Sequence, residues 1–137
     1  MSAYLFDSSA IINLVKKGTV KPFAHGVTLD LALYEVLNAI WKEHLLLKRF
    51  DKETALQLLG IISSIFNIIK IISIRGLEEE VFNLASKENI TIYDASYLYI
   101  AMRNNFILIT DDKELKSKAL KYVKAFTSGE VVSKYKP

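Results

Sequence analysis

The sequence predicts an α/β fold in which a mainly parallel central sheet is flanked by helices. Short apolar runs suited to buried strands alternate with longer stretches of helical spacing, and acidic residues directly follow two of the strands. The chain has 137 residues, of which 51% are hydrophobic, enough to build one buried core. We therefore expect a single domain over residues 1–137.

The amino-terminal half is predicted to contain two strands and two helices. The apolar run before Asp7 indicates a buried strand, and the serines after it suit the start of a helix. A proline and two glycines farther along indicate a loop. In order, we expect a strand at 3–6, a helix from residue 8, a loop at 16–26, a strand at 27–29 and a helix at 31–47.

The carboxyl-terminal half is predicted to continue this alternation. Asp51 suits the start of a helix, and the run FILIT at 106–110 is the clearest buried strand. In order, we expect a helix at 51–66, a strand at 68–74, a helix at 77–87, a helix that begins near Asp94, the strand at 106–110, a helix at 113–121, a strand at 122–126 and a short basic tail. In the helix at 77–87, the residues expected to face inward are Val81, Phe82, Leu84 and Ala85.

The apolar run at 56–74 has one charged residue, Lys70, and approaches the length needed to span a bilayer. Polar residues interrupt it, and its last part changes to the Ile-rich pattern of a strand, so a helix followed by a buried strand is the better interpretation. Together with the helix before it, this run carries more hydrophobic surface than one small sheet can cover. We therefore expect a homodimer and no membrane span.

Composition excludes several classes of site. The chain has no cysteine, which removes disulfides, thiolate metal sites and cysteine nucleophiles and fits a reducing compartment. No Gly-x-Ser-x-Gly elbow, phosphate-binding loop or dinucleotide fingerprint is present. The amino terminus has no basic segment before its first apolar run, so we expect no secretory signal and a cytoplasmic protein.

Four acidic residues are predicted to meet at one edge of the sheet. Asp7 and Asp112 follow strands, Asp94 lies at a helix start, and Glu35 lies on a helix face. Ligands of open α/β sheets bind beyond the carboxyl ends of the strands. Clustered carboxylates raise each other's pKa unless a cation balances them, and Mg²⁺ or Mn²⁺ prefers such oxygens. An ion of this kind can activate water for attack on a phosphodiester.

The net charge of +3 supports the same interpretation. Without the four acids the chain carries four more positive charges, so a negative pocket would lie in a positive surface that suits a phosphate backbone. Ordinary solvated lysines explain the surplus equally well. Much of it comes late in the sequence, at Lys113, Lys116, Lys118, Lys121, Lys124, Lys134 and Lys136.

Four segments resemble the acidic motifs of the PIN-domain family, in the family's order: YLFDSSAII, LALYEVLNAIW, YDASYLYIA and LITDDKEL. The resemblance spans nearly the whole chain and is greatest to the VapC-type toxins of VapBC toxin–antitoxin systems. It implies an endoribonuclease that depends on Mg²⁺ or Mn²⁺ and is paired with an antitoxin protein. It also implies catalytic, metal-binding roles for Asp7, Glu35, Asp94 and Asp112 and supporting roles for Ser9, Asn38 and Thr110.

Each acid taken alone has a simpler explanation. Asp94 and Asp111 suit helix caps, with Asp111 and Glu114 at the spacing of a capping box, and Glu35 alone is an ordinary surface residue. Asp111 occupies the variable place of the Thr-x-Asp pattern and is treated as peripheral. A non-catalytic PIN-like module that binds RNA or a protein stays open as the second function. Retention of all four acids favours the enzyme, because a binding module has no use for their repulsion.

Overall fold

The structure is a computed structural model that describes residues 3–134. Its centre is a five-stranded sheet in which every adjacent pair of strands is parallel, in the order β3-β2-β1-β4-β5. The strands are β1 (Tyr4–Phe6), β2 (Val27–Leu29), β3 (Lys70–Ile72), β4 (Ile107–Ile109) and β5 (Ala125–Phe126). The predicted α/β fold with a mainly parallel sheet is confirmed.

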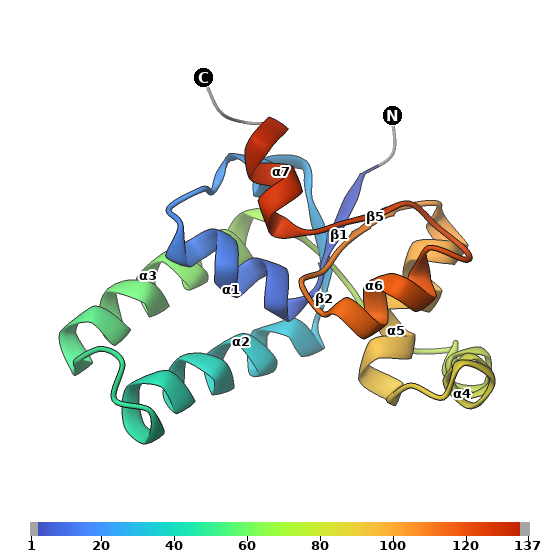
Figure 1. Ribbon diagram of the computed structural model, residues 1–137, viewed down its shortest axis with the longest axis horizontal. Helices are drawn as coiled ribbons and strands as arrows, with labels where there is room; N and C mark the ends of the chain where they lie inside the picture. The colour runs from blue at the N-terminus through green and yellow to red at the C-terminus, as the bar shows by residue number, and fades with distance from the viewer. Residues whose placement is uncertain (1–2, 135–137) are drawn as a thin grey trace.

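Helices cover both faces of the sheet (Figure 1). The helices α1, α2 and α3 pack against one another on one side, and α4 packs against α5 on the other. The α-helices are α1 (Ser8–Lys16), α2 (Leu31–Trp41), α3 (Lys52–Ile68), α4 (Glu78–Glu88), α5 (Ile92–Asn104), α6 (Lys113–Ala119) and α7 (Ser128–Lys134). A 3₁₀ helix, η1 (Lys21–His25), precedes β2, and a π-helical turn, η2 (Lys42–Leu46), extends α2.

The strands β1 and β4 determine where the candidate site lies. The chain runs outward from β1 through β2 to β3, and later returns to the other side of β1 to form β4 and β5. The carboxyl ends of β1 and β4 therefore lie side by side where the strand order reverses, which is where open α/β sheets bind ligands. Both strands are anchored in the core, since Leu5, Phe6, Leu108 and Ile109 are fully buried.

Several local expectations were wrong. Phe82 is 62% exposed, because α4 buries only the narrow face formed by Val81, Leu84 and Ala85. The strand expected at 122–126 is limited to the two residues of β5. The described part of the basic tail is a helix, α7, whose Val131 is fully buried and which packs against α1.

The apolar run at 56–74 divides into most of α3 and the strand β3, as expected. The strand was expected to be buried, which was wrong: Lys70 and Ile71 are exposed, because β3 is at the edge of the sheet. The helix α3 begins at an Asp51 cap, whose Oδ1 accepts a hydrogen bond from the backbone N–H of Thr54 at 2.8 Å. The helices within residues 3–134 include none with the length and hydropathy needed to cross a bilayer.

Candidate functional site

Asp7 and Thr110 meet just beyond the ends of β1 and β4. Phe6 is in register with Ile109, and the backbone N–H of Asp7 donates to the Ile109 carbonyl at 3.0 Å. The next residue of each strand is therefore Asp7 on one and Thr110 on the other, and the Thr110 hydroxyl donates to the Asp7 carboxylate. Strand pairing alone joins two segments that are 103 positions apart.

The Asp7 side chain is held from several directions. Its Oδ1 accepts hydrogen bonds from the Ser9 hydroxyl at 2.7 Å and from the Ala10 backbone N–H at 2.9 Å, so Asp7 also caps α1. The residue is 5% exposed. Burial raises the pKa of the Asp7 carboxyl to about 6, although the three hydrogen bonds act to lower it. Ser9 and Thr110 thus lie where supporting residues were predicted.

Asp112 is exposed and caps α6, with its Oδ1 accepting from the Leu115 backbone N–H at 2.9 Å. Its own backbone N–H donates to the Thr110 hydroxyl oxygen at 3.1 Å, which fixes it beside Asp7. The alternative that assigned this cap to Asp111 was wrong.

Asp111 binds groups on α1 and α7 through its carboxylate and does not cap α6. Its carboxylate accepts from the Asn13 side-chain amide at 2.6 Å and from the Ser128 backbone N–H and hydroxyl at 2.7 and 2.6 Å. Its backbone N–H donates to the Ser9 hydroxyl oxygen at 3.0 Å. Asp111 therefore ties the start of α7 to α1 directly beside the acids. The sequence analysis treated Asp111 as peripheral because it occupies the variable place of the Thr-x-Asp pattern. Its partner Ser128 lies in the segment that was expected to be a tail.

Asp94 lies in the first turn of α5, as predicted, and is half-buried. The helix cap is Thr91, whose hydroxyl oxygen accepts from the Asp94 backbone N–H at 3.1 Å, so the Asp94 carboxylate is not the cap. Burial, followed by the charges of Asp112, Glu35 and Glu114, raises the pKa of Asp94 to about 6. The charges of Asp112 and Glu35 therefore act on Asp94.

Glu35 contacts α5, the helix that carries Asp94, although its own helix, α2, covers the opposite face of the sheet. The Tyr97 hydroxyl, on α5, donates to Glu35 Oε1, on α2, at 2.9 Å. Tyr97 is 2% exposed, and burial followed by the Glu35 charge raises its pKa, so the phenol stays protonated and remains a donor. Tyr97 was not among the site residues predicted from the sequence. Its position one helical turn after Asp94 was the available signal for a place on the same face.

Asn38, the third predicted supporting residue, lies one turn after Glu35 on α2 and is exposed. Within residues 3–134 its side chain makes no hydrogen bond. Its supporting role stays a prediction.

Helix amino termini help to hold this negative charge together. Asp7 caps α1, Asp112 caps α6, and Asp94 lies in the first turn of α5. The positive end of each helix dipole favours a carboxylate at that position. The fold can therefore concentrate acids that would otherwise repel one another.

The donor set suits a hard divalent cation, because it consists of carboxylate oxygens, and burial raises the pKa values of two of the carboxyls, Asp7 and Asp94. Within residues 3–134, no three acidic or histidine side chains are close enough to surround one ion. Magnesium commonly keeps several waters and takes one or two protein carboxylates directly. The arrangement therefore fits an ion that some of these acids would hold through water.

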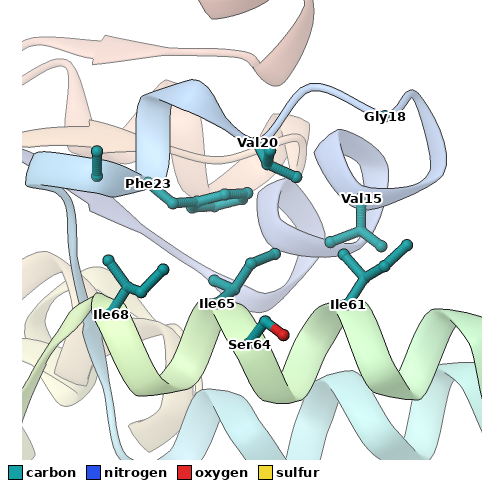
Figure 2. Close-up of a pocket in the computed structure, with 9 residues that line it drawn as sticks. Val15, Gly18, Val20, Phe23, Ile61, Ser64, Ile65 and Ile68 are labelled. Atoms are coloured by element: carbon teal, nitrogen blue, oxygen red, sulfur yellow. The ribbon is translucent and has the colours of Figure 1, made fainter.

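An apolar pocket lies elsewhere, between η1 and α3 (Figure 2). Phe23 and Val20 face Ile61, Ile65 and Ile68 across a space of about 420 Å³. No acid, histidine or lysine lines it. It offers surface for a partner rather than groups for chemistry.

The chain matches known proteins over most of its length. The PIN domain matches residues 4–121. Exonuclease VapC9 of Pyrobaculum aerophilum is 34% identical over 117 residues, which are 84% of each chain. Ribonuclease VapC3 of the same organism is 35% identical over 91 residues, 66% of this chain and 69% of that protein.

Solved structures share the fold. The crystal structure of PAE2754 from Pyrobaculum aerophilum superposes with a TM-score of 0.77 at 29% identity, covering 97% of this chain and 88% of the other. VapBC from Salmonella typhimurium, solved bound to DNA, superposes with a TM-score of 0.62 at 8% identity, covering 93% and 99%, and shows the fold alone. The family match and the 34%-identical relative agree with the strand order and with the resemblance of the four acidic motifs: the chain belongs to the PIN-domain family.

Proposed function

We propose that this chain is a metal-dependent endoribonuclease that hydrolyses RNA phosphodiester bonds and is the toxin of a toxin–antitoxin pair. The observation that carries the proposal is the position of Asp7 and Asp112 just beyond β1 and β4, where the strand order reverses, with Asp94 near enough to feel the charges of Asp112 and Glu35. The relatives named VapC9 and VapC3 support a nuclease. The cytoplasm is the proposed location, which the lack of cysteine fits.

The proposed cofactor is Mg²⁺ or Mn²⁺, held by Asp7, Glu35, Asp94 and Asp112 directly or through water. When bound, such an ion orients and acidifies a water and neutralises charge on the phosphate. The chain's own residues keep the acids in place. Ser9 and Thr110 orient Asp7, and Tyr97 orients Glu35, in each case by a hydrogen bond to the carboxylate.

A circular RNA tests both the metal and the mode of cleavage. A circle has no ends, so only an endonuclease opens it, which separates the proposed activity from the exonuclease activity that the name of one relative states. We expect linear products with Mg²⁺ or Mn²⁺ and none with EDTA, measured by denaturing gel electrophoresis. Degradation of linear RNA alone would reject internal cleavage. An intact linear RNA would favour the non-catalytic binding module.

The proposed antitoxin is a protein whose cationic side chain reaches the acids. Four clustered carboxylates attract a guanidinium as they attract a divalent ion, and arginine can engage a carboxylate in bidentate fashion. The solved VapBC structures from Salmonella typhimurium and Rickettsia felis were determined with DNA, and they support a paired partner for this fold.

The chain is also proposed to form a homodimer through α3. Leu56, Ile61 and Ile68 remain 55%, 40% and 67% exposed on this helix, which leaves apolar surface that a second copy could cover. We expect Ile68→Lys to convert a dimer into a monomer in light scattering. Phe82→Lys is the matched control, because Phe82 is 62% exposed on α4, across the sheet. A wild-type monomer at high concentration would contradict the dimer.

A further inference from the structure

A groove between α1 and α2 leads away from the acids. Its volume is about 310 Å³. Figure 1 shows these two helices extending side by side from the edge of the sheet. Among the residues that line it are Ser9 and Asn13, from the first two turns of α1, and the charged residues Lys16, Lys42, Glu43 and Arg49.

One end of the groove is continuous with the candidate active site. Ser9 donates to the Asp7 carboxylate at 2.7 Å, and Asn13 donates to Asp111 at 2.6 Å. The seven residue steps from Ser9 to Lys16 span about 10 Å of helix axis. A strand whose scissile phosphate lies at the acids can therefore continue along this groove toward Lys16.

The other end carries more positive than negative charge. Lys16 Nζ and Arg49 Nη1 both donate to one oxygen of Glu43, Oε1, at 2.6 and 3.2 Å. Lys42 has no ion pair within the part of the chain that the structure describes. Three cations and one acid thus line this part of the groove, and the Lys16 and Arg49 side chains stay 39% and 61% exposed.

Three of the lysines late in the sequence do not offer the same excess of positive charge. Lys116 pairs with Glu130 at 2.7 Å and Lys118 with Glu114 at 3.3 Å, and Lys121 pairs with Glu88. These pairs are one to one, so their charges largely cancel. The positive surface that the sequence suggested near the carboxyl terminus is therefore weaker than its lysine count implies.

We propose that Lys16, Lys42 and Arg49 form a subsite for backbone phosphates of the RNA strand that flank the scissile bond. This inference rests on the proposed ribonuclease function. Glu43 is the positioning residue, because its shared oxygen holds the Lys16 and Arg49 head groups on one wall of the groove. Phosphate contacts of this kind give affinity without sequence preference and weaken as salt rises.

The test measures binding of a fluorescein-labelled single-stranded RNA of mixed sequence to the full chain in EDTA, by anisotropy over a series of salt concentrations. We expect Lys16→Ala, Lys42→Ala and Arg49→Ala each to weaken binding roughly three- to tenfold and to reduce the salt slope by about 0.7. In metal-supported cleavage, KM should rise several-fold while kcat stays unchanged.

Arg103→Ala and Lys124→Ala are the matched controls. Both residues are exposed and lie near the amino ends of β4 and β5, at the opposite edge of the sheet. We expect both to bind RNA as wild type does, and melting temperatures should show that every variant is folded.

Equal RNA affinity and equal salt slope in the groove variants and the controls would overturn the subsite. So would groove variants that lose only the antitoxin, since the groove would then hold a protein. If wild-type protein cleaves RNA and the groove variants keep its KM, this inference fails and the proposed function stands. If wild-type protein neither cleaves nor binds RNA, the proposed function itself fails.

Discussion

Asp112→Asn is expected to reduce metal-dependent RNA cleavage by about a hundredfold or more while leaving the fold intact. Asp112 is exposed, and the oxygen that caps α6 at 2.9 Å is retained in asparagine, which is an equally good cap. The change therefore removes one negative charge from the proposed metal site and little else. Initial cleavage rates and thermal melts on the same samples measure both effects.

Asp51→Asn is the matched control for this experiment. Asp51 is also exposed and also caps a helix, α3, through one carboxylate oxygen at 2.8 Å from a backbone N–H. It lies outside the acidic cluster, so its variant should keep full activity and the same melting temperature within error. If Asp112→Asn cleaves RNA as well as Asp51→Asn does, Asp112 is only a helix cap and its metal role is rejected.

Asp7→Asn is expected to stabilise the metal-free protein at neutral pH. Burial raises the pKa of Asp7 from 3.8 to about 6, so the folded state holds its proton more tightly than the unfolded state does. The stabilisation from the protonated form is present below pH 4 and is lost as the pH rises through about 6. At pH 7 the ionised carboxylate therefore lowers the free energy of unfolding by up to about 3 kcal/mol.

Asparagine avoids the cost of burying an ionised carboxylate, but it weakens the hydrogen bond with Thr110. Its oxygen can accept from Ser9 and Ala10 as the carboxylate does, whereas its amide faces the Thr110 hydroxyl, which must turn to accept. We therefore expect a net gain of about 1 to 3 kcal/mol at pH 7 in EDTA. Below pH 4 the gain should disappear.

Urea denaturation at several pH values in EDTA measures this difference. Adding Mn²⁺ at pH 7 should stabilise wild-type protein more than Asp7→Asn, because binding to the folded state adds to its stability. Cleavage should be lost in the variant. A variant that is less stable than wild type at pH 7 in EDTA would contradict the assigned cost of burying this charge.

Some helix caps and buried strands were predictable from the sequence because they depend on a few adjacent residues. The Asp51 cap and the apolar run before Asp7 carry their signals within one turn or one strand. The end of α2 was less predictable. Apolar spacing continues through Leu45 to Leu47, in and just after a π-helical turn. These leucines are more than half exposed, so burial of apolar surface does not stabilise a continued α-helix there.

The sequence by itself determined the identity and order of the acidic residues and the positions of Asp7 and Asp112 after strands. The alternation of strands and helices dictates which residues reach the carboxyl edge of the sheet. Only the tertiary structure decided which groups hold them. Tyr97 reaches Glu35 across 62 positions, and Asp111 joins Asn13 to Ser128 across 98 and 17 positions. Such contacts depend on how helices from opposite faces and a terminal helix pack together, and no local pattern records that geometry.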